Sequence, residues 1–291
     1  MDTKLVSRVI VSGMLATIMR VCLAPVERAK VLMQTHDFND AKSDLKCNDL
    51  FQCLAKIAAV EGPFGWWKGV CSTIVGAWIV AVFSATLSPL IRKRLTEMIG
   101  NRGSSLGLTI VSTLIGAVIG SVSVFLSYPF EAAYIIIASR IGDESTVNST
   151  LGAWQTTGMI SIYSGLLVAV LGVFVQRFVS NFVYEKVGPL LSSFDPFTRK
   201  FVESQIQSVP SQLASDPLET IRRWSLLDAA RVTGSHHLTS LGSASDIYSV
   251  GGISGFFAGS VATLFKSMIA TGVNILNEDH VEPALRKALP A

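Results

Sequence analysis

The amino-acid sequence predicts an all-α membrane protein in which six transmembrane helices form three two-helix repeats. Three observations predict this fold class: an apolar composition, a pair of short motifs that recurs three times, and long apolar stretches between the motifs. Of the 291 residues, 49% are hydrophobic and 15% are charged, whereas soluble domains carry about 25% charged residues. The mean hydropathy of +0.48 also favours a membrane protein, in which each spanning helix needs about 20 residues.

Composition and motif content argue against several classes of function. The net charge is only +3, and no basic stripe interleaved with aromatic residues is present, so we expect no nucleic-acid partner. We find no nucleophile–base motif and no phosphate loop, and we therefore predict no catalytic residues, no enzyme activity and no resident cofactor. The cysteines have no paired spacing and no histidine pattern beside them, so no metal site is expected; they are Cys22, Cys47, Cys53 and Cys71.

Two motifs recur three times along the chain. The first is a proline followed two residues later by a glutamate, and it begins at Pro25, Pro129 and Pro217. The second is a pair of glycines at constant spacing with an aromatic residue two positions before the second glycine, which is Gly69, Gly165 or Gly259. One copy would be weak evidence, but three paired copies at nearly equal intervals indicate internal repeats. We therefore divide the chain into repeats at 1–100, 101–193 and 194–291.

Each repeat contains two apolar stretches that the motifs separate. The six predicted spans are residues 6–33, 70–99, 106–139, 166–191, 201–227 and 260–289. The first span of each repeat carries its proline well inside, which would kink the helix by removing a backbone donor. Membrane helices tolerate such prolines where neighbours satisfy the freed groups. The fifth span is the most polar, and we expect its glutamines and serines to face the bundle interior.

Polar stretches follow the first span of each repeat. Residues 35–48, 142–150 and 233–245 are rich in polar side chains, and we predict them to be connecting loops. Short helices are expected after them.

These paired motifs resemble those of the mitochondrial carrier family over almost the whole chain. The first repeat, from Ala24 to Gln34, is similar to that of the ADP/ATP carriers. The resemblance implies six tilted helices in three pseudo-symmetric pairs, with short matrix-side helices parallel to the membrane. It also implies a multi-pass protein of the mitochondrial inner membrane that contacts membrane lipid, including bound cardiolipin.

The resemblance implies a matrix gate made of acid–base pairs between repeats. Two of the family's pairs are retained, Glu131 with Arg222 and Glu219 with Lys30. The partner of Glu27 is replaced by a tyrosine whose hydroxyl can still donate one hydrogen bond. The full predicted set is Glu27, Lys30, Gln34, Glu131, Tyr134, Glu219 and Arg222. In some carriers a polar residue, called a brace, lies beneath the ring of acid–base pairs, and Gln34 matches its position. Ordinary helix-end pairing is the alternative reading of these residues.

The implied cytoplasmic gate departs further from the family pattern. Its predicted members are Arg92, Tyr184, Glu185 and Asp279. Of these, Asp279 with Arg92 is the one pair that can form between repeats. Pro89, Gly188 and Glu282 stand where the family places gate residues, and the implied encounter of Glu185 with Glu282 is repulsive. A carrier needs this second gate when its matrix side opens, so these departures argue against transport.

The positions implied to contact substrate are mixed. The three family contact points fall on Gly76, Gly172 and Lys266, whereas ADP/ATP carriers have a base at the first. Other bases lie near them in the sequence, so the predicted substrate residues are Arg20, Gly76, Gly172, Arg177, Arg223 and Lys266. Four bases in one cavity would favour a phosphate or carboxylate. The alternative is that these bases pair internally or reach toward an interface.

Two functions therefore stay open at the level of sequence. The first is a carrier that exchanges small anionic metabolites, nucleotide-like or carboxylate, by alternating access. The second is a degenerate pseudo-carrier that has lost transport and serves as a structural subunit of a larger inner-membrane, respiratory complex.

Overall fold

The chain is an assembly of helices. The computed structural model describes residues 3–35, 49–99, 105–140, 150–158, 161–188, 191, 195–230 and 240–288, and these residues contain no β-strand. The long helices are α1 (Thr3–Thr35), α3 (Val70–Ile99), α4 (Ser105–Ala138), α6 (Leu166–Val187), α7 (Pro196–Ala229) and α9 (Ser260–Leu276). The helices that we call short are α2 (Leu50–Glu61), α5 (Thr150–Thr157), α8 (Ser240–Phe256) and α10 (Glu282–Ala288). Helix α8 has the same 17 residues as α9 in length, but it is broken by a non-helical backbone at Gly252. The predicted all-α fold class is confirmed.

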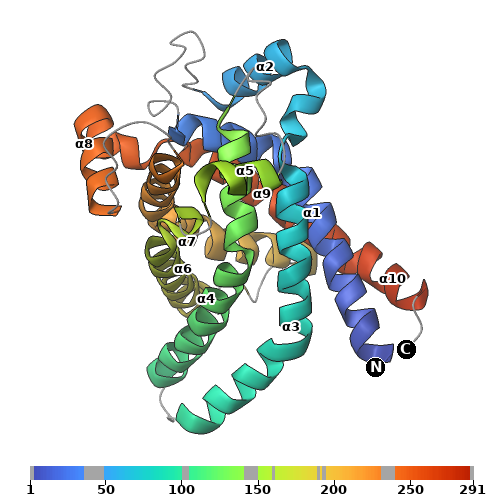
Figure 1. Cartoon of the computed structure of the whole chain (residues 1–291). Helices are drawn as coiled ribbons and strands as arrows, with labels where there is room; N and C mark the ends of the chain where they lie inside the picture. The colour runs from blue at the N-terminus through green and yellow to red at the C-terminus, as the bar shows by residue number, and fades with distance from the viewer. Residues whose placement is uncertain are drawn as a thin grey trace.

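The six long helices form a closed ring. Each packs against the next long helix along the chain, and α9 packs against α1 to complete the circle (Figure 1). The helices α1, α4 and α7 also contact one another. The ring is therefore drawn together where these three helices meet.

The short helices repeat one arrangement three times. Helix α2 packs on α1, α5 on α4, and α8 on α7, and all three lie toward the same end of the molecule, at the top of Figure 1. Short helices were predicted after the polar stretches and are found there. The polar stretches themselves fall mostly outside the described residues, but the third was predicted too long because α8 begins at Ser240.

The second motif begins the even-numbered span of each repeat in the same way. Gly69, Gly165 and Gly259 have φ of +82°, +78° and +77°, values that glycine adopts without steric cost. A Cβ at these positions would lie 3.1 Å from the Tyr134 ring, 3.1 Å from the Arg222 carbonyl oxygen and 3.3 Å from Lys30 Cγ, respectively. Each glycine thus lies against the equivalent residue of the next repeat around the ring. The boundaries of the repeats remain a prediction.

The core of the protein lies in the half that carries the short helices. Pro25, Pro129 and Pro217 lie inside continuous helices. The largest buried apolar cluster combines the end of α4 with the end of α7 and Ile247 of α8. A second cluster joins α1 to α2. The other half of the ring is less buried, which leaves room for a cavity there.

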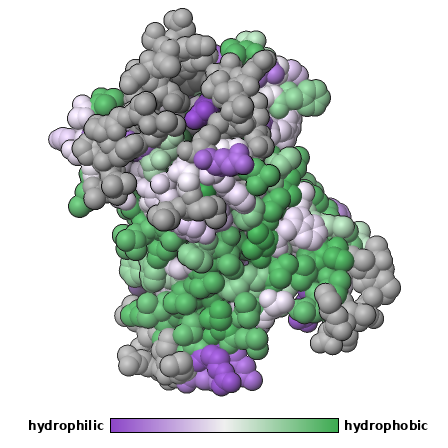
Figure 2. All heavy atoms as spheres, viewed as in Figure 1, coloured by the Kyte–Doolittle hydropathy of each residue, from purple (hydrophilic) through white to green (hydrophobic). Residues whose placement is uncertain are grey.

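The outer surface fits a membrane environment. By length and hydropathy, four helical segments can cross a bilayer: Leu5–Thr35, Pro63–Glu97, Ile110–Ala138 and Ser161–Val187. A fifth is the pair Ser240–Phe256 and Ser260–Leu285, which is bent by 50°. Figure 2 shows hydrophobic residues over the middle of the visible face, with hydrophilic residues toward its ends. Helix α7, the predicted fifth span, is absent from this set because its composition is polar.

Three polar residues of α7, Ser204, Gln205 and Ser208, lie against α9. Gln205 Nε2 donates to Thr271 Oγ1 at 2.8 Å and to the Ser267 carbonyl at 3.1 Å, and its Oε1 accepts from Ser267 Oγ at 3.0 Å. Ser204 and Ser208 exchange hydrogen bonds with Thr271 and Ser267 at 2.9 and 2.7 Å. Hydrogen bonds between side chains therefore join the two long helices of the third repeat.

The sixth predicted span is interrupted. We predicted one helix over residues 260–289, but α9 ends at Leu276, a π-helical turn covers Asn277–Val281, and α10 follows. Pro283 has no backbone N–H, so it cannot donate to the carbonyl of residue 279 in the α-helical pattern. The hydrogen-bond register changes at this point for that reason.

Candidate functional site

A buried ion pair joins α1 to α7. Lys30 Nζ lies 2.7 Å from Glu219 Oε2 and 2.8 Å from Asp216 Oδ1. The structure thus brings together the predicted pair of Lys30 and Glu219. It adds Asp216, which sequence reasoning missed; the available signal was an acid directly before Pro217 of the motif.

A second predicted pair joins α7 to α4. Arg222 Nη1 lies 3.5 Å from Glu131 Oε2, and the Arg222 guanidinium lies 5.8 Å from the centre of the Tyr128 ring. Tyr128 donates a hydrogen bond to the Ser164 carbonyl at 2.5 Å. The cation is therefore positioned by both a carboxylate and an aromatic face.

The third predicted pair of the matrix gate, Glu27 with Tyr134, differs from the prediction. The Tyr134 hydroxyl, which could have donated a hydrogen bond, is buried and has no hydrogen-bond partner among the described residues. Glu27 is instead 3.0 Å from Lys266 Nζ of α9 and 3.8 Å from Arg20 Nη1. A phenol supplies no positive charge, so the buried carboxylate is paired with cations from other positions.

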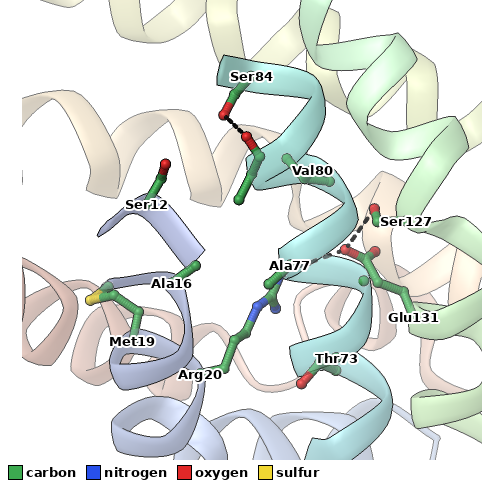
Figure 3. Close-up of a pocket in the computed structure, with 12 residues that line it drawn as sticks. Ser12, Ala16, Met19, Arg20, Thr73, Ala77, Val80, Ser84, Ser127 and Glu131 are labelled. Carbon is green, nitrogen blue, oxygen red and sulfur yellow. Dashed lines mark hydrogen bonds and ion pairs between the residues drawn. The ribbon is translucent and has the colours of Figure 1, made fainter. Parts of the chain in front are cut away.

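Arg20 links this group to α4. Its Nη2 atom lies 3.7 Å from Glu131 Oε1, and Figure 3 shows the Arg20 side chain of α1 directed toward Glu131. Arg223 Nη2 pairs with Glu219 Oε1 at 2.5 Å on the same helix, whereas its Nε and Nη1 are buried without a hydrogen-bond partner in the described structure.

These charges form two ion-paired groups, one around Glu27 and Glu131 and the other around Lys30, and we call the two groups together the acid–base ring. Its cations are Arg20, Lys30, Arg222, Arg223 and Lys266, and its carboxylates are Glu27, Glu131, Asp216 and Glu219. The cations outnumber the carboxylates by one. A surplus of positive charge in a poorly solvated site attracts anions.

The predicted brace residue Gln34 lies beneath the ring without bracing it. Neither Oε1 nor Nε2 of its side chain has a hydrogen-bond partner within the described residues. Its backbone carbonyl accepts a hydrogen bond from Trp224 Nε1 at 2.8 Å. Gln34 therefore helps to hold α1 on α7 through its main chain.

A cavity of about 350 Å³ adjoins the ring between α1, α3 and α4. This volume is at the small end of the range for ligand sites. Arg20 and Glu131 bring charge to its wall, and Ser12, Thr73, Ser84 and Ser127 bring hydroxyls (Figure 3). The predicted contact residues Arg20 and Gly76 meet here. A Cβ at Gly76 would lie 3.2 Å from Phe130 Cβ, so α3 and α4 pack closely where ADP/ATP carriers have a base.

The other predicted substrate residues do not join this cavity. Lys266 and Arg223 belong to the acid–base ring. Gly172 faces Leu218 of α7, and Arg177 is exposed with its Cδ against Gly116 of α4. The expected basic cavity of four cations is therefore not formed, and three of them pair internally, as the alternative reading held.

The predicted cytoplasmic gate is not assembled in this conformation. Asp279 Oδ1 lies 3.1 Å from Lys200 Nζ, whereas we expected Arg92 as its partner. Lys200 is near the start of α7, beside the π-helical turn that carries Asp279. Arg92 is an exposed residue of α3, and Tyr184 and Glu185 occupy the last turn of α6.

Sequence reasoning also missed a buried arginine that joins the first two repeats. Arg28 has no exposed surface. It pairs with Glu61 at 2.5 Å and donates to the carbonyls of Gly65 and Arg140, the latter at 3.1 Å. Lys68 Nζ also pairs with Glu61 at 3.1 Å. The signal was present, since Arg28 lies inside the first motif and Glu61 and Lys68 inside the second.

Comparison with known proteins agrees with this architecture. The family model described as mitochondrial carrier protein matches residues 2–98 and 108–195. The ADP,ATP carrier protein of Neurospora crassa is 23% identical over 281 residues, covering 91% of this chain and 88% of that protein. ADP/ATP translocase 4 of Homo sapiens is 22% identical over 264 residues, covering 87% and 84%. ADP,ATP carrier protein 1 of Saccharomyces cerevisiae is 23% identical over 278 residues, covering 91% and 89%.

The family model covers more than half of the chain, and the relatives extend the similarity over most of it. The family consists of carriers rather than enzymes, and its members are multi-pass proteins of the mitochondrial inner membrane. The chain therefore belongs to the mitochondrial carrier family.

Proposed function

We propose that this chain exchanges small anionic metabolites, nucleotide-like or carboxylate, by alternating access. The observation that carries the proposal is the position of the cavity directly beside the acid–base ring, with Arg20 shared between them. The ring is the matrix gate of this proposal, closed here, and the cavity lies on its far side from the short helices. The names of the relatives support an anionic solute.

The geometry suggests how a bound anion would loosen the gate. Arg20 is held by Glu27 and Glu131 at 3.8 and 3.7 Å, which are long for ion pairs. A phosphate or carboxylate in the cavity would compete with these acids for Arg20, and for Lys266 beyond it. A ligand shifts a conformational equilibrium by its difference in affinity between the two states. Binding that weakens the ties of α1 to α4 and α9 would therefore favour opening of the matrix gate.

Exchange by the purified chain in liposomes tests this proposal. Vesicles preloaded with adenine nucleotides or with di- and tricarboxylates should take up the matching labelled solute from outside. Lys266→Ala should abolish exchange because it removes the closest cation of Glu27. Arg94→Ala is the matched control, since Arg94 is an exposed cation whose pair with Glu97 lies within one helix. Absence of flux with every anion, or equal flux in the two variants, would contradict the proposal.

Membrane lipid is the second partner that we propose, including the cardiolipin implied by family resemblance. Large apolar side chains of the long helices are exposed, among them Leu87, Phe125, Leu167 and Phe178, and acyl chains would cover those that face outward. Mass spectrometry of the purified protein should detect co-purified cardiolipin after extensive detergent washing, and its loss would contradict this part.

A second candidate function is a structural subunit that does not transport. It is favoured by the residues at the end of the six-helix circle opposite the short helices. There Pro89, Gly188 and Glu282 replace the family's gate residues, and Lys200 pairs with Asp279. Native electrophoresis of mild-detergent extracts separates the two. A subunit would migrate at constant stoichiometry with a larger inner-membrane complex, whereas a carrier would migrate alone.

A further inference from the structure

Two carboxylates share one lysine in the acid–base ring. Lys30 Nζ donates to Asp216 Oδ1 at 2.8 Å and to Glu219 Oε2 at 2.7 Å. Asp216 is fully buried, and its carboxylate also accepts from Thr263 Oγ1 of α9 at 3.1 and 3.3 Å. A carboxylate without access to water depends on such partners to stay charged.

Asp216 and Glu219 would differ in the cations left beside them if α1 moved away from α7. Glu219 would keep Arg223, which pairs with it at 2.5 Å from one turn along α7. For Asp216, Lys30 is the one cation within ion-pair distance among the residues that the structure describes. Helix α9 contributes the neutral Thr263, and α8 reaches the adjacent Thr220 through the carbonyl of Phe256. The nearest charge on α9 is Lys266, which Glu27 holds at 3.0 Å.

Opening of the matrix gate requires that Lys30 on α1 separate from α7. Asp216 would then retain one hydroxyl as its polar partner. A buried carboxylate that loses its cation becomes neutral by binding a proton, because an isolated buried charge costs far more.

We propose that Asp216 is a proton-binding site that fills when the matrix gate opens. The Asp216 carboxylate stays packed against α9 at Thr263, takes one proton from water that reaches the place left by Lys30, and returns it to water when the Lys30 ammonium comes back. The proton is therefore a ligand of the open state, and acidification favours opening. This inference rests on the proposed function only for its role in a transport cycle, since the linkage of gate and proton holds for the gate alone.

The coupling between gate opening and proton binding sets how strongly the open-to-closed ratio depends on pH. If opening binds one proton, the ratio of open to closed protein changes up to tenfold per pH unit where the open site is protonated and the closed site is not. Glu219 contributes little to this slope because Arg223 accompanies it in both states.

Cysteine accessibility measures the gate directly. Gln34→Cys, in the full chain with Cys22, Cys47, Cys53 and Cys71 replaced by serine, places a thiol beneath the ring, where the glutamine side chain has no hydrogen bond within the described structure. Inverted membrane vesicles are treated with an impermeant thiosulfonate between pH 5 and 8. The labelling rate is divided by that of a Ser249→Cys protein, whose thiol on α8 is exposed and corrects for thiol ionisation.

The normalised rate should rise as the pH falls. Asp216→Asn should give a high rate that does not change with pH, whereas Glu219→Gln should keep the pH dependence. Thr263→Val, which removes the hydroxyl that supports the charged carboxylate, should raise the normalised rate at pH 8 and keeps the test available if Asp216→Asn does not fold. A rate that is flat with pH in the protein with Asp216, or an unchanged slope in Asp216→Asn, would overturn the proposal.

The exchange assay separates this inference from the proposed function. A pH-dependent labelling rate without flux of any anion would contradict the transport proposal and support the proton site. Anion flux with a pH-independent labelling rate would support transport and contradict the proton site.

Discussion

Two buried tyrosines of α4 differ in whether their hydroxyl groups make a hydrogen bond. Tyr128 and Tyr134 are both buried, at 0% and 6% exposure. The Tyr128 hydroxyl donates to the Ser164 carbonyl at 2.5 Å, whereas the Tyr134 hydroxyl has no hydrogen-bond partner in the described part of the chain. Tyr134 replaces the base of the family motif, so its ring fills the space while its hydroxyl contributes no bond.

Removing each hydroxyl should have opposite effects on stability. Tyr134→Phe should raise the free energy of unfolding by about 1 kcal/mol, because a buried unsatisfied group is removed. Tyr128→Phe should lower it by about 1 kcal/mol, because the Ser164 carbonyl loses its donor. Melting temperatures of the two variants in detergent provide the measurement. Equal shifts of the same sign would show that the Tyr134 hydroxyl is satisfied in solution.

At the scale of elements, the junction between the second motif and the next repeat is a close contact between neighbouring helices. Gly165 and Gly158 both have positive φ, at +78° and +82°. A Cβ at Gly165 would lie 3.1 Å from the Arg222 carbonyl, whereas a Cβ at Gly158 would meet nothing within 4 Å. Alanine at Gly158 therefore measures the free-energy cost of the backbone conformation alone, whereas alanine at Gly165 adds the cost of crowding α7.

Alanine at the two glycines should therefore destabilise unequally. Gly158→Ala should cost about 1–2 kcal/mol for the left-handed conformation alone. Gly165→Ala should cost about 1–3 kcal/mol more because α6 and α7 must move apart. Thermal unfolding compares the two variants, and similar melting temperatures would contradict the close approach of Gly165 to Arg222.

The hydrogen bonds between α7 and α9 are a second property of elements. Gln205→Ala should lower stability by about 1–2 kcal/mol, because three hydrogen bonds to Ser267 and Thr271 are lost. Gln212→Ala on the same helix is the control and should change stability little. A large effect of Gln212→Ala with none of Gln205→Ala would mean that α7 is rotated relative to the structure.

For the whole molecule, the acid–base ring has one more cation than carboxylates, and under the proposed function it would attract an anionic solute. A true anionic ligand should stabilise the protein by mass action, by about 2.7 kcal/mol at a concentration of 100 Kd. Thermal scans with adenine nucleotides and carboxylates should show this rise in the unsubstituted chain and in Arg94→Ala, but not in Lys266→Ala. The absence of a shift with every adenine nucleotide would exclude a nucleotide-like substrate.

Much of the architecture could be predicted because the motifs are local and recur. The prolines and glycines of the two motifs mark the helices in which they lie, and apolar length marks the spans between them. The pairs Lys30–Glu219 and Glu131–Arg222 followed from the family resemblance and are formed. The end of α9 was missed although the sequence turns polar at Asn277, because the predicted span was extended through Pro283 to Leu289.

The sequence by itself determined an all-α membrane protein of the carrier family, the prolines inside its long helices, and the residue types of the acid–base ring. Only the tertiary structure decided the partners: Asp216 with Lys30, Lys266 and Arg20 with Glu27, and Lys200 with Asp279. The physical reason is that a buried charge pairs with whichever opposite charge the packed helices bring within reach. That proximity depends on the faces that distant helices turn toward each other, which spacing along one chain does not contain.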